Sequence, residues 1–188
     1  MRILEYWCGN LGLILIKTKR FEDVRGFFSE TYSSHQFAKI GLDIEFVQDN
    51  HSLSRGVGTL RGLHFQAPPS PQGKLVRCGR GAIFDVAIDI RLGSPSYGQW
   101  EGYELTADNG HQLYVPVGFA HGFLTLEPDS EIVYKCTDYY APENEGAVRW
   151  DCCGIDWPLT GDPILNDKDA IAPAFADLES PFIYGENS

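Results

Sequence analysis

The feature that most constrains the fold of this chain is a series of short segments in which apolar and polar residues alternate. The clearest is FDVAIDIR (84–91), whose even positions are all apolar and whose odd positions are mostly charged. Alternation with a period of two places each set on one face of a β-strand. The segments HQLYVP, HGFLTL and EIVYKCTDYY have strand-like composition, and clusters of Gly, Pro, Asn and Asp lie between them. This pattern predicts many short strands joined by tight turns.

Helix signals are few. The best candidate is SSHQFAKIG (33–41), which has serines suited to an N-cap and Gly41 as a stop. After Trp157 the chain is interrupted by Pro and Asp, so we expect a loop with about one turn of helix. We therefore predict one all-β domain over residues 1–188, a β-sandwich or barrel of the jelly-roll type with a few short helices. Its ends would be an N-terminal strand region (1–20) and a C-terminal loop and helix tail (159–188).

Composition excludes several classes of protein. Of 188 residues, 43% are hydrophobic and 22% are charged, which is an ordinary globular mix. No apolar run approaches the roughly 20 residues that span a bilayer, and we interpret the apolar patch at 11–16 as a first strand, not a signal peptide. The formal net charge of −11 disfavours nucleic acid and membrane surfaces as partners.

The cysteines indicate a reducing compartment. An odd number, including one adjacent pair and no C-x-x-C spacing, argues against a disulfide framework and against a zinc site. We therefore expect a cytoplasmic protein. The five are Cys8, Cys78, Cys136, Cys152 and Cys153.

Two histidines follow glycines in strand-like segments. The stretch PVGFAH (116–121) fits the P-x-G-x-x-H element of cupin barrels, which delivers a histidine inward. Metal-binding cupins add an H-x-H pair, but here the segment reads His64-Phe65-Gln66. A divalent metal would have two imidazoles and a weak amide, fewer than the three protein ligands that catalytic sites use. We therefore predict no metal and no cofactor, with a metal-dependent cupin oxygenase as a minor alternative.

Strand parity raises a question about His64. Arg61 and His64 are three residues apart, so a regular strand would place them on opposite faces. A bulge at Gly62 would bring both side chains inward. Tyr134 and Tyr140 are six apart, so a regular strand would place them on one face.

These segments together resemble the dTDP-4-dehydrorhamnose 3,5-epimerase family of bacterial deoxysugar synthesis. The resemblance covers most of residues 21–169, in family order, and adds little over the first twenty and last fifteen residues. The matching segments are FEDVRGFFSE (21–30), FVQDNHS (46–52), LRGLHFQ (60–66), PQGKLVRC (71–78), FDVAIDIR (84–91), SPSYGQW (94–100), QLYVPVGFAHGF (112–123), YKCTDYY (134–140) and WDCCGIDWP (150–158).

The resemblance implies a metal-independent cupin that forms a homodimer, with the N-terminal segment reaching across to the partner subunit. The implied reaction inverts C3 and C5 of dTDP-4-dehydro-6-deoxy-D-glucose to give dTDP-4-dehydro-L-rhamnose. A proton on carbon next to a ketone is weakly acidic, so this chemistry needs a base, a donor at the ketone oxygen, and an acid on the opposite face. By resemblance, His64 is the base and Asp169 orients it, Lys74 stabilises the enolate oxygen, and Tyr134 is the acid.

The resemblance also implies a set of substrate contacts. Tyr140 would stack on the thymine ring with Phe28 on its other side, and Glu143 competes with Glu145 as a nucleotide contact. Arginine and lysine in this set would supply a local basic site on an acidic chain. The implied substrate-binding residues are Arg25, Phe28, Glu30, Gln48, Asp49, Asn50, Arg61, Lys74, His121, Tyr140, Glu145 and Lys168.

Two further expectations concern residues outside this set. Asp85 and Arg91 are expected to form scaffold pairs. Cys152 and Cys153 replace a more polar stretch expected in the family, and we assign them no catalytic role. The motifs are compatible with three alternatives: a mono-epimerase acting at C3 or C5 alone, the metal-dependent oxygenase, and a non-catalytic nucleotide-sugar binder. They do not specify the order of the inversions or the final deoxysugar.

Overall fold

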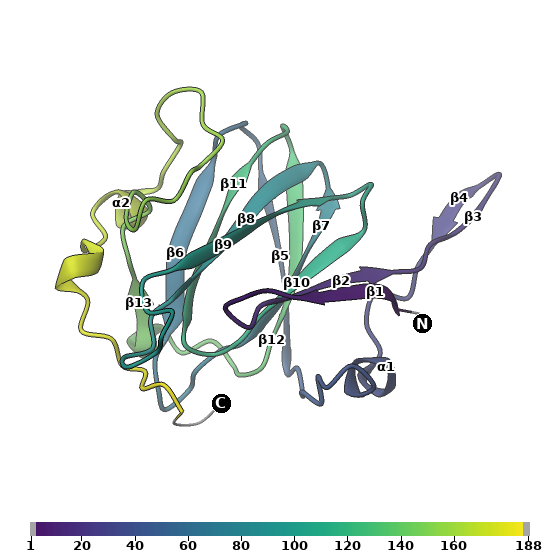
Figure 1. Ribbon diagram of the computed structural model, residues 1–188. Helices are drawn as coiled ribbons and strands as arrows, with labels where there is room; N and C mark the ends of the chain where they lie inside the picture. Colours follow the sequence, from purple (N-terminus) through teal and green to yellow (C-terminus); the bar gives the residue numbers. More distant parts are fainter. Residues whose placement is uncertain (1–2, 186–188) are drawn as a thin grey trace.

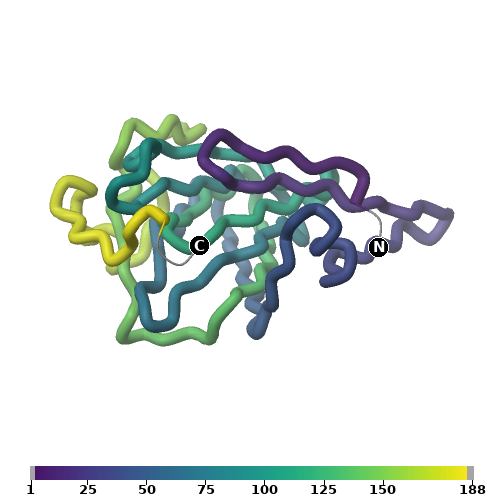
Figure 2. The backbone as a smooth tube through the Cα atoms, turned by 60° about the horizontal axis from the view of Figure 1, so that its bottom comes forward, coloured from purple at the N-terminus to yellow at the C-terminus, as the bar shows by residue number. Residues whose placement is uncertain are grey.

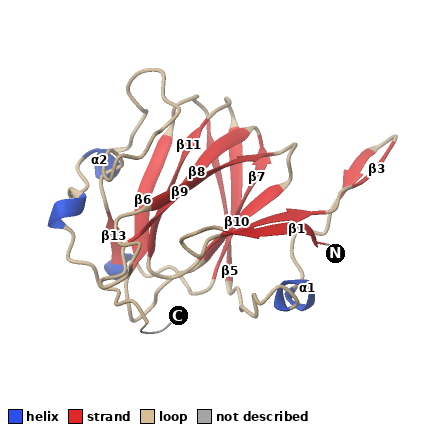
Figure 3. Cartoon of the chain, in the orientation of Figure 1, coloured by secondary structure: helices blue, strands red, loops and turns tan. Residues whose placement is uncertain are grey.

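Strands dominate the computed structural model, which describes residues 3–185 (Figure 1, Figure 3). Two antiparallel sheets pack face to face. The six-stranded sheet has the order β1 (Ile3–Cys8), β2 (Ile14–Thr18), β10 (His111–Val115), β7 (Lys74–Arg80), β12 (Ser130–Cys136) and β5 (Gln48–Ser54). The five-stranded sheet has the order β13 (Glu145–Ala147), β6 (Leu60–Gln66), β11 (Phe119–Thr125), β8 (Ala82–Asp89) and β9 (Trp100–Thr106). The prediction of an all-β jelly-roll sandwich of the cupin type is confirmed.

The alternation in residues 84–91 separates two apolar clusters. Val86, Ile88 and Ile90 belong to a cluster on the outer face of the five-stranded sheet. Ala87 points the other way, into the interior that both sheets enclose. The charged side chain of Asp85 lies on the same inward side and is 0% exposed. Strand β8 is therefore covered on both faces, and its inward carboxylates need partners inside the sandwich.

Irregular segments cover the outer faces of both sheets. On the six-stranded sheet, Phe37 of helix α1 (Ser34–Ala38) packs in a cluster with Ile16 and Leu75. The predicted helix at 33–41 is thus confirmed in a shorter form. The C-terminal tail covers the five-stranded sheet with Trp157 and Phe182. Its short helices are α2 (Asp167–Ala170) and the 3-10 turn η2 (Phe175–Asp177), preceded by the 3-10 turn η1 (Pro142–Asn144).

A small hairpin, β3 (Phe21–Asp23) with β4 (Gly26–Phe28), projects away from the sandwich (Figure 1). Figure 2 shows it at the opposite end of the molecule from the C-terminal tail. Its apolar side chains are exposed, with Val24 at 104% and Phe28 at 64%. In residues 3–185, no helix is long and apolar enough to cross a membrane.

Strand β6 carries the bulge expected at Gly62. Arg61 and His64 pair with residues two apart on β11, so Gly62 and Leu63 together lie opposite Gly122. Gly62 has a φ of +128°, and a Cβ there would lie 2.6 Å from the Cα of Gly122. Only glycine tolerates both conditions. The bulge turns Leu63 into the outer cluster and leaves Arg61 and His64 facing the interior.

Candidate active site

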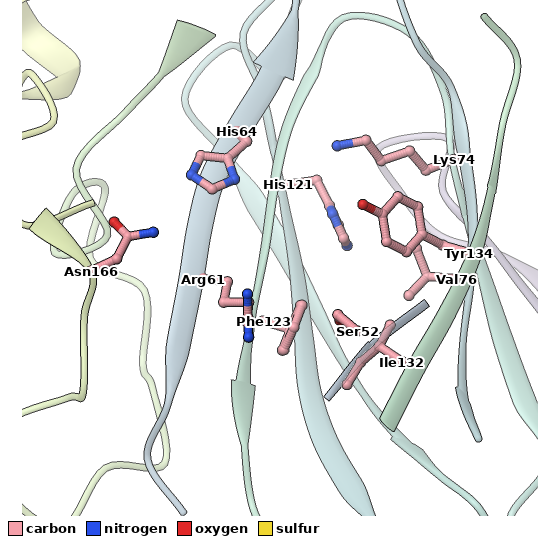
Figure 4. Close-up of a pocket in the computed structure, with 10 residues that line it drawn as sticks. All are labelled: Ser52, Arg61, His64, Lys74, Val76, His121, Phe123, Ile132, Tyr134 and Asn166. Carbon is pink, nitrogen blue, oxygen red and sulfur yellow. The ribbon is translucent and has the colours of Figure 1, made fainter. Parts of the chain in front are cut away.

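A cavity with two lobes opens between the sheets, and Figure 4 shows the side chains that line one of them. We call the lobe of about 170 Å³ the inner lobe and the neighbouring lobe of about 250 Å³ the outer lobe. Three side chains line both: His64, Lys74 and Tyr134. The inner lobe is completed by Ser52, Arg61, Val76, His121, Phe123, Ile132 and Asn166, and the outer lobe by Gln48, Asn50, Phe65, Gln66, Gln72, Tyr140 and Glu145.

The polar groups of the inner lobe come from opposite walls. His64 and His121 belong to the five-stranded sheet, where they pair across β6 and β11. Lys74 and Tyr134 belong to the six-stranded sheet, on the neighbouring strands β7 and β12. In Figure 4 the Tyr134 hydroxyl points across the cavity toward the histidine wall. A flat ligand held between the walls would have imidazole on one face and phenol on the other.

His64 is bonded to a carboxylate from the C-terminal tail. Its Nε2 lies 2.6 Å from Oδ1 of Asp169, whose side chain is 1% exposed. The other carboxylate oxygen accepts the backbone N–H of Gly62 at 3.3 Å. Because a carboxylate only accepts, Nε2 carries the proton and Nδ1 keeps a lone pair for a ligand. Nothing in the spacing of residues 105 apart in the chain could have revealed this contact.

Asn166 is a lining residue that sequence reasoning missed. Its Oδ1 accepts the backbone N–H of Asp169 at 2.7 Å and caps α2. The cap fixes the turn that presents the Asp169 carboxylate to His64. The signal was available: an asparagine three residues before an aspartate in N-D-K-D is a recognisable N-cap pattern.

His121 is also bonded to a carboxylate, but deeper in the sandwich. Its Nε2 lies 2.8 Å from Oδ1 of Asp85, and the side chains are 10% and 0% exposed. Asp85 and Arg91 each belong to a pair within the scaffold, as expected, but they do not pair with each other. Arg91 lies beyond the end of β8 and folds back onto Asp89 at 2.7 Å, whereas Asp85 lies farther inside. Among the residues that the structure describes, none forms a hydrogen bond with the second oxygen of Asp85.

Burial changes the acid–base chemistry of the opposite wall. It lowers the pKa of Lys74, while the negative charges of Asp85 and Glu145 partly oppose that shift. Burial raises the pKa of Tyr134. The phenol therefore stays protonated as a hydrogen donor. Within the described part of the chain, the Lys74 ammonium has no hydrogen-bond or ion-pair partner.

The outer lobe is built around Tyr140. Gln48 accepts the backbone N–H of Tyr140 at 3.0 Å and donates to Asn50 at 3.1 Å. The Tyr140 ring is left 54% exposed. Oε2 of Glu145 lies 3.4 Å from the Tyr140 hydroxyl and 3.5 Å from Nζ of Lys168 at the rim. Of the two competing glutamates, Glu145 lines the lobe.

Arg61 is held along the same cavity. Its Nε donates to Oγ of Ser54 at 3.1 Å, and its terminal nitrogen donates to the carbonyl of Leu53 at 3.1 Å. These bonds leave guanidinium N–H groups free to meet an anion, because arginine carries five donors.

Five expected ligand contacts do not line the cavity of their own chain, and one of them, Lys168, lies at its rim beside Glu145. Asp49 lies on the other face of β5, where it pairs with Lys135 at 2.9 Å, because alternate residues of a strand face opposite ways. Arg25 pairs with Asp23 on the projecting hairpin. Phe28 lies on the same hairpin, and Glu30 follows it as an exposed residue.

Of the three residues that could have formed a metal site, Gln66 is engaged elsewhere, because its amide is bonded to backbone groups. Both cavity histidines bind carboxylates through Nε2. Across residues 3–185, no cluster of three or more His, Cys, Asp or Glu side chains is arranged to hold a metal ion. Burial raises the pKa of the Cys152 thiol to about 12, and both adjacent cysteines pack against the tail cluster.

A jelly-roll sandwich with imidazole, ammonium and phenol groups around one cavity defines a class of acid–base isomerase. A family model described as dTDP-4-dehydrorhamnose 3,5-epimerase matches residues 11–177. The chain belongs to the dTDP-4-dehydrorhamnose 3,5-epimerase family.

Similarity to individual proteins extends over most of the chain. The chain is 50% identical over 172 residues to the dTDP-4-dehydrorhamnose 3,5-epimerase of Sinorhizobium fredii, covering 90% of this chain and 88% of the relative. A Legionella pneumophila epimerase solved in complex with dTDP-4-keto-L-rhamnose has a TM-score of 0.89 at 42% identity, covering 93% and 94%. A 3'-monoepimerase from Streptomyces bikiniensis, in complex with dTDP-quinovose, has a TM-score of 0.82 at 36% identity, covering 88% and 84%.

Proposed function

We propose that this chain inverts C3 and C5 of dTDP-4-dehydro-6-deoxy-D-glucose to give dTDP-4-dehydro-L-rhamnose, without a metal or cofactor. The observation that carries the proposal is the opposition of His64 and Tyr134, which line one cavity from different sheets. Inversion by proton transfer requires that the proton leaves one face of the carbon and returns to the other. Family membership favours this function over an oxygenase or a simple binder.

In the proposed mechanism, Nδ1 of His64 removes the proton on the carbon next to the ketone. The electron pair moves to the ketone oxygen and forms an enolate. The negative charge of Asp169 stabilises the resulting imidazolium and holds the ring in one orientation. The phenol of Tyr134 then donates its proton to the opposite face of the same carbon, and solvent exchange restores both groups.

Lys74 is proposed to stabilise the enolate oxygen. Its ammonium lies on the wall beside Tyr134 and has no ion-pair partner within residues 3–185, so it is available to a developing negative charge. Burial partly desolvates this ammonium and lowers its pKa, and electrostatic stabilisation is stronger in a water-poor site. Buried His121 lies on the opposite wall, and we propose that it also contacts the sugar.

The outer lobe is proposed to bind the nucleotide. Tyr140 offers an exposed ring for the thymine, and Gln48, Asn50 and Glu145 offer hydrogen-bonding groups around it. Arg61 and Lys168 are proposed to meet the diphosphate between the two lobes. This concentrates positive charge locally on a chain whose net charge is −11.

We further propose that the active enzyme is a homodimer in which the β3–β4 hairpin completes the partner's site. The hairpin exposes apolar side chains that its own chain does not cover. It carries Arg25 and Phe28 and projects away from the sandwich (Figure 1). Exposed apolar surface of this kind typically marks an interface. In this arrangement Arg25, Phe28 and Glu30 would contact the nucleotide sugar bound to the other subunit.

We propose that the enzyme works in the cytoplasm, since its five cysteines are free thiols.

Deuterium wash-in tests the reaction. Incubation of the substrate with enzyme in deuterium oxide should place deuterium at both C3 and C5, as read by NMR and mass spectrometry. Label at only one carbon would identify a mono-epimerase. Absence of label despite tight dTDP binding would identify a binder.

A complementation experiment tests the hairpin exchange. Arg25→Ala and His64→Ala are each expected to lose most activity. Mixed dimers should regain activity, because the intact hairpin of the His64→Ala chain then completes the intact cavity of the Arg25→Ala chain. If each hairpin served its own chain, the mixture would remain inactive.

A further inference from the structure

Gln66 is the last residue of β6, is 4% exposed and lines the outer lobe, and both ends of its amide are bonded to backbone groups. Its Nε2 donates to the carbonyls of Ser70 and Tyr139, the latter at 2.9 Å. Its Oε1 accepts the backbone N–H of Ala141 at 2.9 Å. One side chain therefore ties the end of β6 to the loop that follows it and to the segment after β12.

The bonds to Tyr139 and Ala141 flank Tyr140 on both sides. The backbone N–H of Tyr140 itself donates to Gln48 at 3.0 Å. Two glutamine side chains thus fix the backbone of three consecutive residues, although the Tyr140 ring remains 54% exposed. A short exposed segment would otherwise have only its own turns to hold it, and ordering it on binding would cost conformational entropy.

Neighbouring contacts join the same two loops. The N–H of Ala67 donates to the carbonyl of Asn144 at 2.8 Å, and Nε2 of Gln72 donates to the carbonyl of Asp138 at 2.8 Å. Gln66 differs from these contacts because it is the buried member that reaches both loops at once. Replacing its amide would remove the side-chain partner of two carbonyls and one N–H in the segments that it joins.

We propose that Gln66 is a positioning residue that pre-organises the Tyr140 platform of the outer lobe for the base of a nucleotide. The inference rests on the proposed function for the identity of the ligand. Gln66 occupies the position at which a metal-binding cupin would carry its second histidine, and here the amide orders a ligand platform. It acts through Tyr140 and does not touch the reacting carbons, so its effect falls on nucleotide affinity.

The test compares Gln66→Leu with Gln99→Leu, an exposed glutamine with one long bond to the carbonyl of Pro95. Calorimetry with dTDP should show binding to Gln66→Leu weakened by about 10- to 100-fold, as expected for three lost backbone partners. KM should rise by a similar factor, while kcat changes by less than about threefold. Hydrogen–deuterium exchange should accelerate in residues 137–145 without any ligand.

Gln66→Glu provides a conservative rescue. An ionised carboxylate cannot donate to two carbonyls, so affinity at neutral pH should fall. A protonated carboxyl has one donor and one acceptor, so the affinity relative to the parent at each pH should recover as pH falls. Gln66→Leu should show no such recovery.

The outcomes separate the two proposals. Affinity of Gln66→Leu within about twofold of Gln99→Leu, or unchanged exchange in residues 137–145, would overturn the role of Gln66. A fall in kcat equal to the fall in kcat/KM would also overturn it, because the residue would then act on the chemistry. If the parent failed to bind dTDP, the proposed function would fail, while the exchange measurement would still decide whether Gln66 holds the platform.

Discussion

The molecule contains two histidine–carboxylate pairs that face each other across β6 and β11, and their surroundings differ. The His64 ring is 33% exposed and its carboxylate comes from α2 in the C-terminal tail. The His121 ring is 10% exposed and its carboxylate comes from the adjacent central strand β8. The first pair joins two separate parts of the fold at the cavity wall, and the second is enclosed by one sheet.

This difference indicates that the two histidine–carboxylate pairs have different roles. A base must release and accept protons repeatedly, which requires access to substrate and a carboxylate that stabilises the imidazolium. His64 with Asp169 meets both conditions. The buried pair instead places the negative charge of Asp85 near Lys74, where it favours the ammonium form. The first pair is therefore expected to transfer protons and the second to set the charge of the opposite wall.

The largest expected effect comes from removing the accessible imidazole. His64→Ala should lower kcat/KM and deuterium wash-in by ~10³-fold or more, because no other group takes its place as base. His51→Ala is the matched control: this exposed histidine on β5 pairs with Glu131 outside the cavity and should leave activity unchanged. Wash-in of His64→Ala within about tenfold of the parent would contradict the assignment of the base.

Asp169→Asn should have the next largest effect. An amide can donate to the imidazole and cannot stabilise its charge, so kcat should fall by ~10²-fold or more while dTDP affinity is retained. Steady-state kinetics with dTDP calorimetry checks both. An equal loss of affinity would mean that Asp169 supports the ligand and not the base.

Asp85→Asn tests the role proposed for the second pair, because its effect should be exerted through Lys74. Removing this negative charge takes away an attraction that favours the ammonium, so the pKa of Lys74 should fall further. Because the proposed mechanism needs the charged form, the alkaline decline of activity should begin at a lower pH than in the parent. The pH profile of kcat measures this. An unchanged alkaline limb would remove the proposed link.

The smallest effect is expected at the cap that supports the first pair. Asn166→Ala removes the acceptor for the Asp169 N–H and should lower kcat by about three- to tenfold through a less ordered carboxylate. Asn166→Ser keeps a capping oxygen and should recover most of that loss. If the Ser variant were as impaired as the Ala variant, the side chain would be acting on substrate and not as a cap.

Several features could be predicted because they depend on local rules. Alternation in residues 84–91 identified a central strand, and the three-residue spacing of Arg61 and His64 required a bulge that Gly62 permits. The resemblance named His64, Lys74 and Tyr134, and the structure brings these three to one cavity. The N-cap pattern that ends in Asp169 was equally local, although its meaning depended on the contact with His64.

What the sequence by itself determined is the period of each strand, the position of the bulge and the chemical groups available to the cavity, because these follow from neighbouring residues. The tertiary structure alone decided which partners meet. It brought the His64 ring within hydrogen-bond distance of a carboxylate 105 residues away and set Asp85 beside His121. Such contacts depend on which strands pair and on how the tail packs against the sheet, and no local spacing encodes the distance between residues on different elements.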